Sequence, residues 1–223
     1  METLPGECSV KMISALRRTY MRLRFGKPVV IVSGLPRSGT SLIMQMLHAG
    51  GLEAVTDEIR EADVDNPKGY YELEKVKELD KGGDKSWLAE HKGKVIKIIS
   101  FLLRDLPLDL NYKVVFVLRD IDEIIVSQNK MLARRKEVGS TVSDEEMKKN
   151  YDMHLRKVRY LLKHTPNFET LYVNYRDIIE NPSEQAEQLS KFFNGKLDIN
   201  AMSTVVSKDL YRNRREVLAT GSG

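Results

Sequence analysis

Four short apolar runs constrain the fold of this 223-residue chain more than any other feature of its sequence. The first run, Val29-Val30-Ile31-Val32, does not alternate apolar and polar side chains, which indicates a strand buried on both faces, as in a parallel sheet. The other runs are of the same kind and lie at residues 95–99, 114–118 and 170–173. We therefore expect all of these runs to be strands of one buried sheet.

The segments between and after the runs carry helical signals. Ser143 is a candidate N-cap with Glu146 at the capping-box position, and the helix that follows should end before Pro166. Strands that alternate with helices predict an α/β fold, a single domain in which helices cover both faces of a parallel sheet. Ligands of such sheets bind beyond the carboxyl ends of the strands. Further helices are expected over residues 41–48, 72–80, 121–136 and 183–193.

The loop after the first strand, Gly34 to Ser41, has the spacing of a phosphate-binding P-loop, except that Thr40 occupies the lysine position. Backbone N–H groups and a helix N-terminus still form an anion site there. In nucleoside triphosphatases the missing lysine reaches the phosphates and a metal helps to neutralise them. No acidic metal partner follows another strand here, and Arg119 would repel a metal. The sequence thus predicts a P-loop-type sheet and a phosphate-bearing donor that requires no metal.

The segment Pro36-Arg37-Ser38-Gly39-Thr40-Ser41 resembles the 5′-phosphosulfate loop of sulfotransferases. These enzymes take a sulfonate group from 3′-phosphoadenosine 5′-phosphosulfate (PAPS) and release 3′-phosphoadenosine 5′-phosphate (PAP). The resemblance implies that Pro36, Arg37, Ser38, Gly39, Thr40 and Ser41 bind the cofactor. It also implies that Arg37, where cytosolic members usually have lysine, stabilises the leaving phosphate.

Two further segments carry the same resemblance in the family's order. Arg119 ends the third strand and Ser127 follows eight residues later, as in the family's 3′-phosphate motif. A guanidinium can bind a phosphate through two hydrogen bonds, and a 3′-phosphate distinguishes PAPS from ATP. Tyr175, which follows the fourth strand and precedes Asn181-Pro182, resembles the tyrosine that lies against the adenine in cytosolic members. The closest likeness is to short bacterial sulfotransferase-like proteins.

The resemblance also indicates which residues act in catalysis. Lys97-Ile98-Ile99 aligns with the Lys-Thr-His of cytosolic members, so Lys97 joins Arg37 as a candidate and the histidine base is absent. Leu42 likewise replaces a stacking tryptophan. Other members use an acidic base after the first helix, and we prefer Glu72, then Glu58. The acidic candidates are Asp57, Glu58, Asp63 and Glu72.

The charge and the cysteine content of the chain indicate which partners and which cellular compartment to expect. The 36 Lys and Arg exceed the 32 Asp and Glu by a net charge of +4, but they mostly alternate with acids, as in residues 80–85 and 144–149. Such mixing is typical of a solvated surface, so we expect no nucleic-acid partner. Cys8 has no disulfide partner within the chain, no apolar run is long enough for a membrane span, and no signal peptide is recognisable. We expect a cytoplasmic protein.

The chain divides into three predicted parts. Residues 1–26 form a basic amphipathic helix, with Leu16 and Leu23 on its apolar side, that packs on the domain; weak contact with a membrane surface is the alternative. Residues 27–206 form the sulfotransferase-like domain. Residues 207–223 form a basic tail, in which the role of Arg212–Arg215 stays open, as does the oligomeric state.

The predicted activity is in-line transfer of a sulfonate from PAPS to a hydroxyl or amine of a small-molecule, carbohydrate, lipid or peptide acceptor, whose identity the sequence leaves open. A P-loop kinase or nucleoside triphosphatase is the alternative enzyme. A nucleotide-binding protein that has lost its activity is the other alternative, and Ile99 in place of the histidine supports it.

Overall fold

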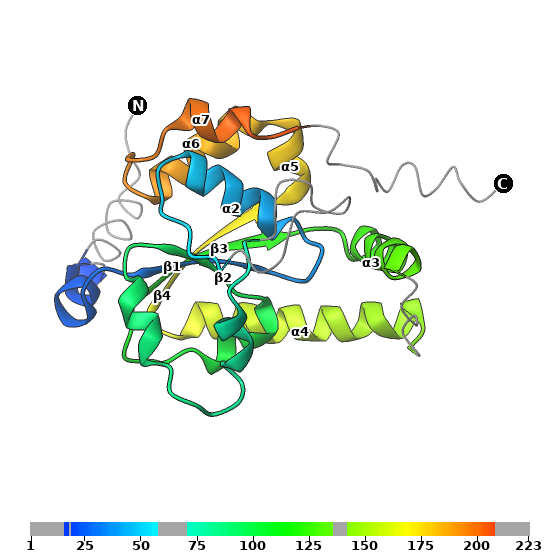
Figure 1. The fold of residues 1–223 in the computed structure, drawn as a ribbon, viewed down its shortest axis with the longest axis horizontal. Helices are drawn as coiled ribbons and strands as arrows, with labels where there is room; N and C mark the ends of the chain where they lie inside the picture. Colours follow the sequence, from blue (N-terminus) through cyan, green and yellow to red (C-terminus); the bar gives the residue numbers. More distant parts are fainter. Residues whose placement is uncertain (1–15, 18, 58–70, 136–141, 208–223) are drawn as a thin grey trace, which may run out of the picture.

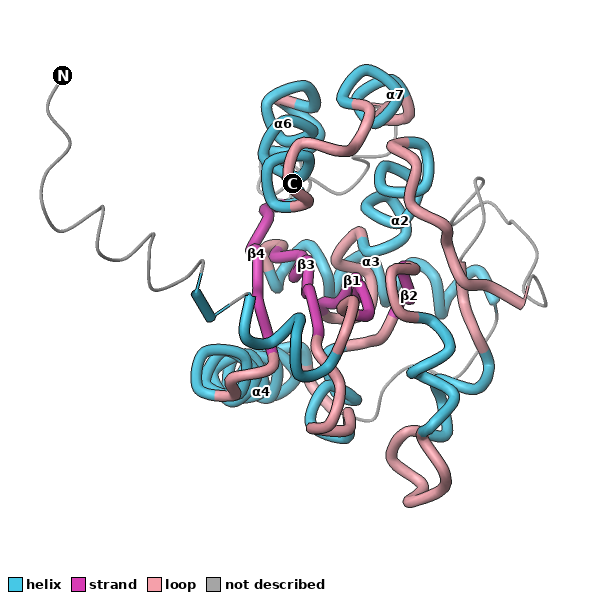
Figure 2. The backbone as a smooth tube through the Cα atoms, turned by 90° about the vertical axis from the view of Figure 1, so that its left-hand side faces the viewer, coloured by secondary structure: helices cyan, strands magenta, loops and turns pink. Residues whose placement is uncertain are grey.

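The strands form one parallel sheet in the computed structural model, which describes residues 16–17, 19–57, 71–135 and 142–207. The order across the sheet is β2-β1-β3-β4, and Figure 2 shows these strands side by side. All neighbouring pairs are parallel, which confirms the predicted α/β fold class. The strands are β1 (Val29–Gly34), β2 (Val95–Lys97), β3 (Tyr112–Leu118) and β4 (Phe168–Asn174).

Helices cover both faces of this sheet (Figure 1). Side chains of a strand alternate between its faces, so Val30 and Val32 enter one apolar core while Val29 and Ile31 enter the other. One face carries α2 (Thr40–Ala49), α5 (Tyr175–Glu180), α6 (Pro182–Phe192) and α7 (Ile199–Thr204). The other face carries α4 (Asp144–His164) and the 3₁₀ helices η1 (Glu74–Glu78), η2 (Ser86–His91) and η3 (Ser100–Asp105). The helix α3 (Ile121–Arg135) follows β3.

The register of the strands places their carboxyl ends next to one another. Gly34, where the loop after β1 begins, pairs with Val117, two residues before Arg119. Leu118 pairs with Asn174, so that Arg119 and Tyr175 each come next along their strands. On the other side of β1, Val32 pairs with Lys97. The predicted site residues therefore come from adjacent strand ends.

Some elements differ from the sequence-based expectation. Residues 72–80 were expected to be helical, but only the short 3₁₀ helix η1 forms there. The second strand was expected to run to Ile99 but ends at Lys97. Ile98 still donates its N–H to the Val32 carbonyl at 3.0 Å, and the chain then enters η3 at Ser100. The expected cap of α4 is confirmed, since the Ser143 hydroxyl accepts the Glu146 N–H at 3.2 Å.

The N-terminal helix also differs in the face it buries. Residues 16–17 and 19–25 are helical, but Leu16, Tyr20 and Leu23 are exposed and Met21 is buried instead. The guanidinium of Arg17 donates to the carbonyls of Pro166 and Phe168, so a basic side chain attaches this helix to the domain. No helix in the described part of the chain is long and apolar enough to cross a membrane. Residues 1–15, Cys8 among them, and the Arg212–Arg215 segment lie outside the described residues.

Candidate active site

The loop between β1 and α2 depends on glycine at two positions. Gly39 has φ +103°, and a Cβ there would lie 2.2 Å from Cδ2 of Tyr175. At Gly34 a Cβ would lie 2.8 Å from the Val117 carbonyl oxygen. Gly39 is also the N-cap of α2 and offers no side-chain acceptor to the first turn, so the helix N-terminus keeps the partial positive charge that favours an anion. The backbone is therefore shaped as the P-loop spacing predicts.

Ser38 adds an unpartnered hydroxyl to this loop. The residue is 1% exposed, and its Oγ has no hydrogen-bond partner within the described residues. A buried hydroxyl without a partner costs free energy, and native structures seldom leave one without a reason. A phosphate or sulfonate oxygen in the loop would supply the missing partner, so this residue fits the predicted anion site.

Arg119 lies in a buried network behind the loop. Its Nη1 donates to the carbonyl oxygen of Arg37 at 3.1 Å, and its Nε lies 3.0 Å from Oε2 of Glu123. The two side chains of this ion pair are only 8% and 4% exposed. The guanidinium also lies 4.5 Å from the ring centroid of Tyr175, a cation–π distance. These contacts fix the guanidinium plane before any ligand binds.

Arg37 connects the two predicted anion sites. Its φ is +68°, a left-handed conformation that is costly for a residue with a Cβ. Its Nε donates to the hydroxyl of Ser127 at 3.2 Å, on the second turn of α3. The structure thus brings Arg37, Ser127 and Arg119 together, although the sequence separates the loop from α3 by about eighty residues.

Tyr175 has a contact that the sequence did not predict. It was expected to lie against an adenine, and that role stays a prediction. Its buried ring packs on the backbone of Gly39 and beside Arg119. The ring therefore supports the loop from the α5 side, and a Cβ at position 39 would collide with it.

Lys97 and Glu72 form a pair at the end of β2. Lys97 Nζ lies 3.4 Å from Glu72 Oε1, and the side chains are 9% and 25% exposed. The Glu72 carbonyl oxygen accepts from the Asp57 N–H and from the Thr56 hydroxyl, which ties its backbone to the neighbouring segment. Of the two acidic candidates that the structure describes, Asp57 and Glu72, it is Glu72 that pairs with Lys97, and its carboxylate is reachable from solvent.

The remaining acidic candidates have other positions. Oδ2 of Asp57 accepts the Glu74 N–H at 2.6 Å, so this carboxylate caps η1. Glu58 and Asp63 lie outside the described residues. The described residues also contain no cluster of three or more His, Cys, Asp or Glu side chains that could hold a metal ion.

Sequence reasoning did not predict the contacts that the residues after β2 make. Ile99 and Phe101, directly after β2, are 39% and 40% exposed. The Phe101 ring stacks on His154 of α4 at 3.8 Å with an interplanar angle of 14°, and His154 Nε2 lies 2.9 Å from the Ser100 hydroxyl. Burial, aided by the nearby cations, lowers the pKa of His154. No local pattern links positions 101 and 154, whereas Glu123 was detectable from its i,i+4 spacing to Arg119.

Comparisons with known proteins bear on this arrangement. Residues 27–218 match the model of the sulfotransferase domain family. No curated protein sequence matches the chain. Solved structures similar to it include a retinol dehydratase in complex with androsterone and inactive cofactor PAP (17% identity, TM-score 0.48, 85% of this chain and 66% of that one). Others are a sulfotransferase from Alicyclobacillus acidocaldarius (12%, 0.46, 86% and 88%) and the sulfotransferase domain from the Curacin biosynthetic pathway (13%, 0.45, 86% and 95%). The chain spans slightly less than two thirds of that retinol dehydratase.

Proposed function

Because this chain belongs to the sulfotransferase domain family, as its motifs predicted, we propose that it transfers a sulfonate group from PAPS to a hydroxyl or amine of an acceptor. The assignment of PAPS as the donor is supported by the two hydrogen bonds that bring Arg37, Ser127 and Arg119 together. PAPS bears its phosphosulfate and its 3′-phosphate on one nucleoside, so its anion sites must lie close together. The hydrogen bonds between the loop, the end of β3 and α3 meet this requirement.

The residues present fit this donor. Residues 36–41, with the unpartnered Ser38 hydroxyl, would hold the 5′-phosphosulfate, and Arg119 with Ser127 would hold the 3′-phosphate. Tyr175 is the proposed adenine contact. When bound, PAPS supplies the sulfonate and a phosphate that leaves as a stable anion.

The chain's own side chains would then serve three purposes. Arg37 places a positive charge beside the leaving oxygen, which stabilises the charge that develops there. Lys97 adds a second charge and holds the Glu72 carboxylate at 3.4 Å. Glu72 accepts the proton of the acceptor's hydroxyl or amine, the task of a general base.

We further propose that the acceptor has an apolar or aromatic body. Ile99 and Phe101 expose large apolar side chains two and four residues after Lys97, which ends β2 and pairs with Glu72. The stacked His154 ring holds Phe101 in that position. The cytoplasmic location, the domain boundaries and the absence of a nucleic-acid partner stay predictions.

Isothermal calorimetry with PAP and AMP tests the donor. We expect PAP to bind at least about tenfold more tightly, because charge-assisted hydrogen bonds to a 3′-phosphate contribute about 1.5–3 kcal/mol. In Ser127→Ala the preference for PAP should shrink, while the affinity for AMP should not change. Equal affinities for PAP and AMP in the unaltered chain would overturn the proposal. Magnesium-dependent ATP turnover would favour a kinase or triphosphatase, and PAP binding without transfer to any of a broad acceptor panel would favour a binding protein.

A further inference from the structure

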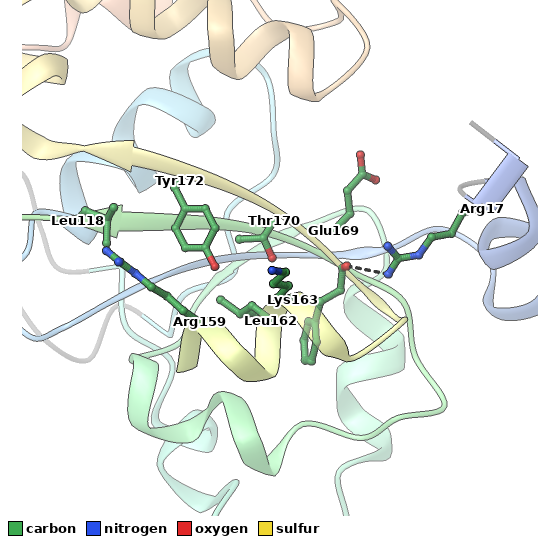
Figure 3. Close-up of a pocket in the computed structure, with 9 residues that line it drawn as sticks. Arg17, Leu118, Arg159, Leu162, Lys163, Glu169, Thr170 and Tyr172 are labelled. Carbon is green, nitrogen blue, oxygen red and sulfur yellow. Dashed lines mark hydrogen bonds between the residues drawn. The ribbon is translucent and has the colours of Figure 1, made fainter. Parts of the chain in front are cut away.

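A cavity lies between the edge strand β4 and α4, and none of its lining residues belongs to the donor loop (Figure 3). Its volume is about 590 Å³, within the range of small-molecule sites. Three of the β4 side chains that line it, those of Phe168, Thr170 and Tyr172, lie on the α4 side of the sheet, whereas Val173 and Tyr175 belong to the α2 side. Its lining residues are Arg17, Leu118, Arg159, Leu162, Lys163, Phe168, Glu169, Thr170 and Tyr172.

Positively charged side chains surround the apolar residues at the bottom of this cavity. Leu118, Leu162 and Phe168 are apolar and belong to, or pack on, the core between the sheet and α4. Arg159 and Lys163 lie one turn apart on α4, and neither forms an ion pair with another described residue. The one carboxylate among the lining residues, that of Glu169, lies 3.3 Å from Lys113 Nζ, and Figure 3 shows it directed away from α4. The cavity therefore has an excess of positive charge.

Hydroxyl groups add a second, independent observation. Thr170 Oγ1 is buried and has no hydrogen-bond partner within the described residues. Figure 3 shows the side chains of Thr170 and Tyr172 on the same side of β4 as Lys163 and Arg159. Burial raises the pKa of Tyr172, with Arg159 opposing that shift, so its phenol stays protonated and can donate. The cavity thus combines positively charged side chains and hydroxyl donors with an apolar bottom.

We propose that this cavity binds a small amphiphilic anion, namely an aromatic or other apolar body that carries one sulfonate, sulfate or carboxylate group. The anionic group pairs with Arg159 and Lys163 and accepts from the Thr170 hydroxyl, which then has the partner it lacks. The apolar body packs on Leu118 and Leu162. Binding at this cavity does not depend on sulfonate transfer.

Titration of the full chain with naphthalene-2-sulfonate tests the site, with methyl NMR as the readout. Its sulfur is bonded to carbon, so it is not a sulfonate donor. We expect shifts at the methyl groups of Leu118 and Leu162, and none at Leu42 and Leu189, which pack on the other face. The neutral naphthalene-2-sulfonamide has the same ring and should bind about tenfold more weakly, since it lacks the charge. Equal binding of both compounds, or shifts confined to the other face, would overturn the proposal.

Variants on α4 separate the proposed pairing from a general charge effect. Lys163→Gln should weaken binding of naphthalene-2-sulfonate by about threefold to tenfold. Lys157→Gln is the matched control, because Lys157 is also an exposed lysine of α4 but does not line the cavity. Thr170→Val keeps the side-chain volume and should also weaken binding. An equal effect of the two lysine variants contradicts the proposal, and so does displacement of the compound by PAP, which would place it in the donor site.

Discussion

Two halves of the site hold their charges in different ways. The proposed donor half comprises the loop 34–41, Arg119, Ser127 and Tyr175, and contacts among Arg37, Arg119, Ser127 and Tyr175 connect its segments. The proposed acceptor half comprises Lys97 and Glu72 with the exposed side chains of Ile99 and Phe101. In the first half side-chain contacts fix the geometry before a ligand arrives, and in the second half Glu72, Ile99 and Phe101 remain accessible to solvent beside the buried Lys97.

This difference suits the proposed division of tasks between binding the donor and binding the acceptor. A preorganised anion site avoids reorganisation when charge moves to the leaving oxygen. The exposed side chains of Ile99 and Phe101 lie outside the strands, so they can be changed without disturbing the sheet. A variant of one half should therefore leave the task of the other half intact, and the predictions below test this separation.

The largest expected effect concerns the acceptor half. Glu72→Gln should lower turnover by about 10²–10⁴-fold, because the variant lacks the proposed general base. Affinity for PAP, measured by calorimetry, should not change. Glu74→Gln is the matched control, since Glu74 lies two residues away and pairs with Lys77 on the surface. Full activity of Glu72→Gln would assign the base to another acid, and a parallel loss of PAP affinity would show that the halves are not separate.

Arg37→Ala tests the donor half in the same assay. Turnover should fall by about 10²–10³-fold, the effect of removing one contact to a developing oxyanion. The hydrogen bond to Ser127 is lost as well, so PAP should bind more weakly, in contrast to Glu72→Gln. Arg37→Lys keeps the charge and should recover part of the turnover. An unchanged rate in Arg37→Ala would remove this residue from the mechanism.

Gly39→Ala tests how tightly the donor loop is packed. The new Cβ would collide with the Tyr175 ring and adopt a left-handed conformation, so the free energy of unfolding should fall by about 2–4 kcal/mol. Gly51→Ala is a close control, because Gly51 has φ +101° and nothing lies within 4 Å of its added Cβ. It should lose only about 1–2 kcal/mol. The free energies of unfolding are measured by chemical denaturation. Similar losses in both variants would mean that the loop shifts to make room for the new Cβ beside the Tyr175 ring.

The donor half was largely predictable because its signals are local. The strand–loop–helix sequence fixes the backbone of residues 34–41, and parallel strands bring their carboxyl ends together whatever the loops between them do. The positions of Arg37, Arg119 and Ser127 follow from those two facts. The packing of Tyr175 on Gly39 does not, since it depends on how α5 leaves β4.

The acceptor half was less predictable because its contacts are distant in sequence. Phe101 meets His154 only because α4 packs beneath the sheet, and neither residue stands in a recognisable pattern. The same limit applies to the N-terminal helix, where periodicity identified apolar positions but not the face that docks. There the bonds of Arg17 to backbone carbonyls, which no periodicity reveals, decide the attachment.

The smallest expected effect concerns pH and the histidine behind Phe101. Because burial lowers the pKa of His154, the unfolded chain takes up a proton near the ordinary pKa of about 6.5 while the folded chain does not. The free energy of unfolding should therefore fall as the pH decreases from about 7 to 5, and the fall should be shallower in His154→Gln. His91, whose pKa burial also lowers, lies in η2 against Trp87, and His91→Gln should flatten the pH dependence similarly. Only His154→Gln should also raise the KM for an aromatic acceptor, because it removes the ring that supports Phe101. A raised KM in His91→Gln, or an unchanged one in His154→Gln, would separate Phe101 from the acceptor half.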